Sequence, residues 1–101
     1  MARLLVTPEA RDDLERLRSR LAAKSPRAAR RAGVVIAEAL VRLRDYPQLG
    51  RPVAGLGSEF REVVVDYGES GYVARYRYDG AADAVVILRI RHQREAGYGS
   101  S

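Results

Sequence analysis

The sequence predicts one α+β domain, in which a short N-terminal strand and an α-helical hairpin precede a three-stranded antiparallel meander. Two helix-start signals, Thr7-Pro8 and Ser25-Pro26, each precede a stretch with apolar residues at helical spacing. Three strand-like runs follow, joined by short turns. Helices grouped before strands in this way indicate an α+β domain with the helices on one face of the sheet. The 101 residues suffice for one such domain, so we assign residues 1–101 to it.

The first predicted helix is amphipathic and follows a short strand at residues 3–6. Its apolar side chains recur at helical spacing and form one stripe: Ala10, Leu14, Leu17 and Leu21. Its acidic residues come early and its basic residues late, as the helix dipole favours: Glu9, Asp12, Asp13 and Glu15, then Arg16, Arg18 and Arg20. We interpret these charged residues as a solvated helix face.

The second predicted helix follows after a very short turn, so the two should form an antiparallel hairpin. Its main apolar stripe consists of Ala29, Ala32, Ile36, Leu40 and Leu43. Glycine inside a helix costs about 1 kcal/mol against alanine, and we expect Gly33 to let the first helix approach closely. Val34 and Val41 lie off the stripe, near Arg30. Two interpretations stay open for them: isolated exposed valines, or a partner groove with a basic rim.

The region at residues 45–59 is rich in glycine and proline and is predicted to be a loop. It lacks the GxxxxGK[ST] pattern and no helix follows, which excludes a nucleotide site of that type. Strands are predicted at residues 60–66 and 72–78. In the second of these, tyrosines alternate with arginines: Tyr72, Ala74, Tyr76 and Tyr78 on one face, Val73, Arg75 and Arg77 on the other. Such a strand can grip single-stranded RNA, but we favour tyrosines half-buried against the helices and arginines reaching water.

The final stretch, VVILRIRHQREAGY at residues 85–98, begins as a near-continuous apolar run and ends in charged residues and a tyrosine. Strict alternation predicts two faces: Val86, Leu88, Ile90 and His92 on one, and Val85, Ile87, Arg89 and Arg91 on the other. A strand that becomes cationic at its end leaves the core for an open surface. We therefore expect this end to be the working part of the protein.

Composition excludes several classes of site. The chain has no cysteine and a single histidine, so thiolate catalysis, disulfides and a cysteine or histidine metal cluster are excluded, and we expect no metal and no cofactor. No apolar run approaches the roughly 20 residues of a membrane span, and the N-terminus does not fit a signal peptide, so we expect a cytoplasmic protein.

The net charge is +5, and every cation except Lys24 is arginine. A basic surface favours nucleic acid or an acidic protein partner.

The order of elements, together with three local motifs, resembles the toxins of the RelE/ParE superfamily from bacterial type II toxin–antitoxin systems. The most specific matches are Phe60-Arg61-Glu62, residues 72–78 and residues 90–98, with residues 49–53 in support. The resemblance covers nearly the whole chain. It implies one of two activities: RelE-like members cut messenger RNA inside the ribosome, whereas ParE-like members are not nucleases and poison DNA gyrase.

For a nuclease, the resemblance implies a catalytic set of Arg61, His92, Arg94 and Tyr98. The lysines typical of RelE-like nucleases are missing, and we expect Glu62 to pair with Arg61. The RHQRE ending resembles the ParE branch instead. We therefore favour a gyrase inhibitor that is not an enzyme and acts by protein–protein binding, with the ribosome-dependent endoribonuclease as the alternative.

On the favoured interpretation, the target-binding residues are Arg91, Arg94, Glu95 and Tyr98, and His92 is structural. The resemblance also implies a cognate ParD-like antitoxin with an acidic segment. Its predicted contact residues are Leu14, Leu17, Val34, Val41 and Arg30. Direct binding of nucleic acid is expected only of the nuclease. A third hypothesis is a toxin-like module that only binds its antitoxin.

Overall fold

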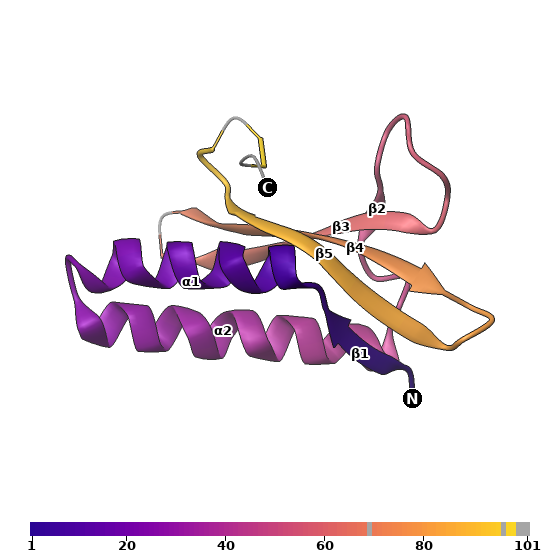
Figure 1. The fold of residues 1–101 in the computed structure, drawn as a ribbon, viewed down its shortest axis with the longest axis horizontal. Coiled ribbons are helices and arrows are strands. Elements are labelled where there is room, and N and C mark those ends of the chain that lie inside the picture. The colour runs from indigo at the N-terminus through magenta and orange to yellow at the C-terminus, as the bar shows by residue number, and fades with distance from the viewer. Residues whose placement is uncertain (69, 96, 99–101) are drawn as a thin grey trace.

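The computed structural model, which describes residues 1–68, 70–95 and 97–98, has the predicted α+β architecture (Figure 1). In chain order the elements are β1 (Arg3–Val6), α1 (Pro8–Ala22), α2 (Pro26–Asp45), β2 (Arg51–Pro52), β3 (Phe60–Tyr67), β4 (Ser70–Asp79) and β5 (Ala84–His92). The short N-terminal strand, the helical hairpin and the meander are thus confirmed. The very short strand β2 was not predicted, because it forms inside the glycine- and proline-rich loop by pairing with β3.

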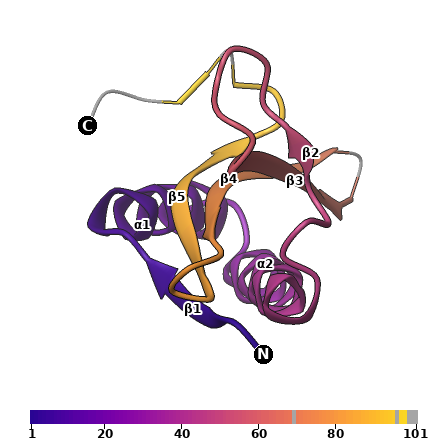
Figure 2. The same ribbon diagram turned by 90° about the vertical axis from the view of Figure 1, so that its right-hand side faces the viewer.

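All strands belong to one sheet in the order β1-β5-β4-β3-β2. The pair β1–β5 is parallel and the other pairs are antiparallel. Both helices lie on one face of the sheet, and no helix of the described residues covers the other face (Figure 2). No helix in the described part of the chain has the length and apolar character needed to cross a membrane.

The helix starts follow the capping signals of the sequence. Thr7 Oγ1 accepts a hydrogen bond from Ala10 N at 3.1 Å, and Ser25 Oγ accepts one from Ala28 N at 3.2 Å. The core lies between the helices and the sheet, and its largest fully buried side chains are Tyr76, Leu43, Ile87, Ile90 and Val85. The tyrosines of β4 pack toward the helices as favoured, although Tyr72 and Tyr76 are fully rather than half buried.

The predicted alternation along β5 is wrong at one position. Arg75 pairs with Arg89 and Tyr76 with Ile87, so Leu88 is an extra residue that forms a β-bulge. The bulge moves Ile87 to the same face as Ile90, and both are fully buried against the helices. The same shift leaves Arg89 and Arg91 on the uncovered face. Alternation read from sequence cannot reveal such an insertion, because a bulge depends on the partner strand.

Two glycines have different roles from those expected. A Cβ placed on Gly33 meets no atom within 4 Å, so Gly33 does not mark a close approach of α1, and that expectation is wrong. Gly50 does mark a close approach: a Cβ there would lie 2.8 Å from the ring and the hydroxyl of Tyr76. Tyr76 Oη accepts a hydrogen bond from Gly50 N and donates one to Pro47 O, both at 2.8 Å. The buried tyrosine thereby fixes the loop after α2.

Candidate functional site

Charged side chains gather on the uncovered face of the sheet. Glu62 comes from β3, Arg75 from β4, Arg89 and Arg91 from β5, and Tyr98 from the segment after β5. Arg75 lies directly opposite both Glu62 and Arg89, and residues paired in this way point to the same face. We call these five residues the arginine–tyrosine cluster.

The ring of Tyr98 lies among three guanidinium groups. The distances from its centroid to Cζ are 4.8 Å for Arg75, 5.5 Å for Arg91 and 5.6 Å for Arg89. A cation over an aromatic ring is stabilised by about 0.5–2 kcal/mol, depending on its exposure to water. The ring therefore helps to hold three like charges close together, which would otherwise repel one another.

One carboxylate oxygen connects the phenol to an arginine. Glu62 Oε2 accepts a hydrogen bond from Tyr98 Oη at 2.8 Å and one from Arg75 Nε at 3.0 Å. Burial, together with the hydrogen bond to Glu62, raises the pKa of Tyr98 above its ordinary value, so the phenol keeps its proton at neutral pH. The cluster thus combines a protonated phenol, a carboxylate and guanidinium groups. No grouping of three histidine, aspartate or glutamate side chains suited to a metal ion occurs among the described residues.

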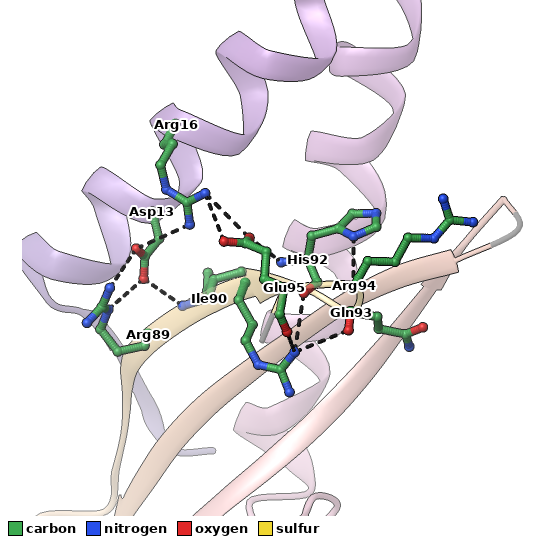
Figure 3. Close-up of polar contacts among 9 residues, drawn as sticks. Asp13, Arg16, Arg89, Ile90, His92, Gln93, Arg94 and Glu95 are labelled. Atoms are coloured by element: carbon green, nitrogen blue, oxygen red, sulfur yellow. Dashed lines mark hydrogen bonds and ion pairs between the residues drawn. The ribbon is translucent and has the colours of Figure 1, made fainter. Parts of the chain in front are cut away.

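Asp13 of α1 forms an ion pair with Arg89 of β5. Arg89 Nε donates to Asp13 Oδ2 at 2.8 Å and Nη2 donates to Oδ1 at 3.1 Å, while Ile90 N also donates to Oδ2 at 2.8 Å (Figure 3). Asp13 is only 4% exposed. Burial disfavours its charge, but the hydrogen bonds from Arg89 and Ile90 outweigh burial, so the pKa of Asp13 lies below its ordinary value. The carboxylate is therefore charged at neutral pH and fixes the end of β5.

Glu95 fixes the turn that follows β5. Its Oε1 accepts a hydrogen bond from His92 N at 2.9 Å, and its Oε2 lies 3.2 Å from Arg16 Nη1 (Figure 3). Burial opposes its charge, but the His92 N–H and Arg16 lower the pKa of Glu95. Arg91 Nη1 donates to the carbonyl oxygens of Glu95 at 3.0 Å and of Gln93 at 3.3 Å. Two predicted target-binding residues, Arg91 and Glu95, thus also build this turn.

The residues of the predicted nuclease set do not lie together in the structure. Arg61 Nη1 donates to the carbonyl oxygens of Gly50 at 2.7 Å and Gln48 at 3.4 Å, away from the arginine–tyrosine cluster. The expected pair of Arg61 with Glu62 is wrong, because neighbouring residues of a strand point to opposite faces. Glu62 pairs with Arg75 across the strands instead.

His92 and Arg94 lie on the helix-covered side, apart from Tyr98. His92 Nδ1 accepts a hydrogen bond from Arg94 N at 3.1 Å, so Nε2 carries the proton and donates to Ser70 Oγ at 3.0 Å. The imidazole meets the ring of Tyr72 edge-on, with centroids 5.5 Å apart. Arg94 and His92 both line a cavity at the end of α1. Of the predicted set, only Tyr98 lies in the arginine–tyrosine cluster.

The predicted antitoxin contacts fall on two neighbouring surfaces. Leu14 and Leu17 line an apolar groove of about 230 Å³ between α1 and α2. Val34 is 55% exposed and Val41 49% exposed, and they lie outside this groove on α2, as does the exposed Arg30.

Sequence reasoning missed four residues of the site: Asp13, Glu62, Arg75 and Arg89. The prediction that Asp13 belongs to a solvated face is wrong, since Asp13 is buried. One signal was available, because Asp13 stands three residues after Ala10 and four before Leu17, on the apolar stripe of the helix. No sequence signal connects the two arginines with Tyr98, because their meeting depends on strand register.

Comparison with known proteins gives matches that agree on a type II toxin but have names from both branches of the superfamily. A family model described as the ParE toxin of the type II toxin–antitoxin system parDE matches residues 4–97. The chain is 42% identical over 88 residues to Toxin RelE3 of Caulobacter vibrioides, covering 87% of this chain and 90% of that protein. It is 39% identical over 92 residues to Toxin RelE1 of the same organism, covering 91% and 94%. The crystal structure of the toxin–antitoxin complex RelBE2 from Mycobacterium tuberculosis contains a chain with a TM-score of 0.62 and 27% identity, covering 91% of this chain and 98% of that chain.

These relatives overturn one prediction. The sequence favoured a protein without catalytic activity, whereas both curated relatives and the solved complex carry RelE-type names, which belong to the nuclease branch of the resemblance. The prediction that the chain is not an enzyme is therefore wrong. It rested on the ParE-like RHQRE ending and on missing lysines, but the strand register assembles positive charge from Arg75, Arg89 and Arg91 instead.

Proposed function

The chain belongs to the RelE/ParE superfamily of toxins from type II toxin–antitoxin systems, and on this basis we propose that it is a ribosome-dependent endoribonuclease that cleaves messenger RNA. The RelE names of its relatives support a nuclease. The observation that carries the proposal is the arginine–tyrosine cluster, in which the hydroxyl of Tyr98 is bound to Glu62 while three guanidinium groups surround its ring.

RNA cleavage by its own 2′-hydroxyl requires three kinds of group. A base takes the 2′-hydroxyl proton, the 2′-oxygen bonds to phosphorus, and the bond from phosphorus to the 5′-oxygen breaks while an acid gives that oxygen a proton. Cations stabilise the negative charge on the phosphoryl oxygens in the transition state. The products are a 2′,3′-cyclic phosphate and a 5′-hydroxyl.

We assign these roles within the arginine–tyrosine cluster. Tyr98 is the acid, because its hydroxyl carries a proton that it can transfer, whereas the guanidinium groups of the cluster do not release theirs. Glu62 is the base, acting through Oε1, which makes no hydrogen bond within the described part of the chain. Arg75 and Arg91 bind the phosphate, because guanidinium groups match phosphate oxygens in charge and geometry.

The test is cleavage of a defined messenger RNA on purified ribosomes, with the ends of the products identified. We expect 2′,3′-cyclic ends from the natural chain. Tyr98→Phe keeps the ring but removes the proton donor, so the cleavage rate should fall at least about 100-fold. Tyr46→Phe, at a tyrosine that is 62% exposed, is the matched control and should cleave normally. Equal rates for Tyr98→Phe and Tyr46→Phe would remove Tyr98 from the mechanism.

Gyrase inhibition, the activity favoured from sequence, has two supports: the ParE-like RHQRE ending and the description of the matched family model as a ParE toxin. A supercoiling assay with the same preparation separates the two activities. Inhibited gyrase with accumulated cleaved DNA, and no RNA cleavage on ribosomes, would overturn the nuclease proposal.

As a type II toxin, the chain has a cognate antitoxin as its partner, and the similar RelBE2 structure is a toxin–antitoxin complex. We infer that an apolar helix of the antitoxin enters the groove between α1 and α2, where Leu14 and Leu17 lie. The net charge of +5 supports an acidic antitoxin segment.

The antitoxin inference is tested by charge insertion. Leu14→Glu places a carboxylate in the apolar groove and should weaken antitoxin binding at least tenfold, by an estimate of about 1.5–3 kcal/mol for a buried leucine. Val64→Glu, at a valine that is 42% exposed on another element, is the control. Equal weakening by both variants would place the antitoxin elsewhere.

A further inference from the structure

A second cationic site lies apart from the arginine–tyrosine cluster. A cavity of about 370 Å³ is lined by residues at the end of α1, at the β3–β4 connection and in the turn after β5. Its cations are Arg20, Lys24 and Arg94. We propose that this cavity, which we call the α1–β5 pocket, binds a phosphate group of single-stranded RNA outside the cleavage site.

The three cations of the pocket form no ion pair with a carboxylate in the part of the chain that the structure describes, although the charge of Arg20 helps to lower the pKa of Glu95. None of their side chains makes an ion pair or hydrogen bond there, and no described carboxylate lines the cavity. Glu69 lies outside the described residues. Several like charges around one cavity that no ion pair neutralises attract an anion. The nearby carboxylate of Glu95 is already held by Arg16 and by His92 N.

A neutral donor completes the pocket. Because His92 Nδ1 accepts the Arg94 N–H, its Nε2–H donates to Ser70 Oγ at 3.0 Å. The hydroxyl of Ser70 therefore uses an oxygen lone pair in this contact, and its own proton stays available for a ligand. The polar side chains that face the cavity thus offer donors, and a phosphate group supplies the matching acceptor oxygens.

The walls of the pocket favour a nucleotide over a simple carboxylate. Tyr67 and His92 supply half-buried aromatic rings, and Leu21 supplies apolar surface. Aromatic rings beside cations are typical of sites for single-stranded nucleic acid, where bases or riboses lie on the rings. Leu17, Leu21 and Tyr72 also line the apolar groove between the helices, so an acidic peptide is the competing occupant.

The turn after β5 connects this pocket with the proposed cleavage site. Arg91 belongs to the arginine–tyrosine cluster and Arg94 to the α1–β5 pocket, and Arg91 Nη1 donates to the carbonyl oxygen of Glu95 in the same turn at 3.0 Å. RNA that crosses this turn would meet both sites. The identification of the ligand as RNA rests on the proposed function, whereas the anion-binding character of the pocket does not.

The experiment uses His92, the single histidine of the chain, as a reporter. The isotope-labelled full-length chain is titrated with inorganic phosphate and with adenosine 5′-monophosphate at constant ionic strength, and the imidazole resonances are followed by NMR. Both probes should shift the His92 resonances in a saturable way, the nucleotide more strongly. This binding assay needs no ribosome, so its result is independent of whether the chain cleaves RNA.

Charge-matched variants separate a specific pocket from general attraction. Arg94→Gln and Lys24→Gln should each weaken adenosine 5′-monophosphate binding about threefold to fivefold. For a short single-stranded oligoribonucleotide, each should reduce the slope of log affinity against log salt by about 0.7. Arg51→Gln, at an exposed residue of β2 outside the pocket, removes the same charge and should change neither quantity.

Three results would overturn the proposal. His92 resonances that stay unchanged up to the highest nucleotide concentration would mean that the pocket binds no phosphate. Equal effects of Arg51→Gln and Arg94→Gln would show that net charge alone attracts RNA. A hexaglutamate peptide that shifts His92 more than the nucleotide does would assign the pocket to an acidic protein.

Discussion

Asp13 and Arg89, 76 positions apart in the chain, form a two-point ion pair that joins the first helix to the last strand. The same carboxylate accepts the N–H of Ile90, so it fixes both a side chain and the backbone of β5. Arg89 in turn lies 5.6 Å from the ring centroid of Tyr98. The position of one guanidinium in the candidate active site thus depends on a buried residue of α1.

Asp13→Ala should lower the free energy of unfolding by about 3 kcal/mol, because removing one partner leaves the other charge and a backbone N–H without their acceptor. Urea denaturation monitored by circular dichroism measures this loss. Asp12→Ala, at an exposed position of the same helix, is the control and should change stability by less than about 0.5 kcal/mol. Similar losses for both variants would mean that the effect comes from helix composition and not from the ion pair.

Stability should depend on pH through Asp13. Its pKa in the folded chain lies below the ordinary value of 3.8, so its contribution is complete above that pH and is lost as the pH falls through the folded pKa. We expect the free energy of unfolding to fall on acidification below about pH 4, and to fall less in Asp13→Asn. Urea melts across this range measure both curves. Parallel curves for Asp13→Asn and the natural chain would contradict the assignment, and Asp12→Asn is the matched control.

Glu62→Gln should lower the pKa of Tyr98. Burial raises this pKa first, and the hydrogen bond to the Glu62 carboxylate raises it further, so removal of the negative charge takes away the second effect only. The pKa of the variant should stay above the ordinary 10.0, because the phenol remains partly buried. Tyrosine Cζ chemical shifts across an alkaline titration measure this. Glu59→Gln, at an exposed residue, should leave Tyr98 unchanged.

Gly50→Ala should destabilise the chain by about 2 kcal/mol, because the added methyl group would lie 2.8 Å from Tyr76 and 2.6 Å from the carbonyl oxygen of Glu62. Thermal unfolding measures the loss. The same change should weaken the hydrogen bonds between Tyr76 and the loop after α2. A melting temperature equal to that of the natural chain would show that the loop shifts to accept the methyl group at no cost.

Gly33→Ala should have the opposite sign and stabilise the free chain by about 1 kcal/mol. The added Cβ meets no atom within 4 Å, so only the helix propensity changes. Urea denaturation measures the gain. A loss of stability would contradict the open space at this position. Gly33 also lines the groove between the helices, so antitoxin affinity should be measured in parallel.

Much of the fold could be predicted because its signals are local. Thr7 and Ser25 each start a helix by accepting an N–H three residues ahead, and the apolar stripes decide which helix face is buried. The exceptions are equally informative. The bulge at Leu88 depends on how β5 pairs with β4, and strand β2 forms by pairing with β3. Neither pairing can be read from the local sequence.

The candidate site was predicted less completely. Sequence motifs pointed to Tyr98 and to the end of β5, and the structure places Tyr98 in the arginine–tyrosine cluster. The other members of the predicted catalytic set point elsewhere: Arg61 toward loop carbonyl oxygens, and His92 toward Ser70 and Tyr72. Residues adjacent in sequence on a strand lie on opposite faces, so nearness along the chain does not indicate a shared site.

The sequence by itself determined the α+β class, the helix starts, the basic charge and the membership of a toxin superfamily, because these depend on local spacing, composition and motifs. Only the tertiary structure decided which charges meet. Strand register placed Glu62 opposite Arg75 and Arg75 opposite Arg89, and helix packing buried Asp13 beside the end of β5. Charge pairing across a sheet depends on distances in space between residues far apart in the chain, and a linear pattern does not contain those distances.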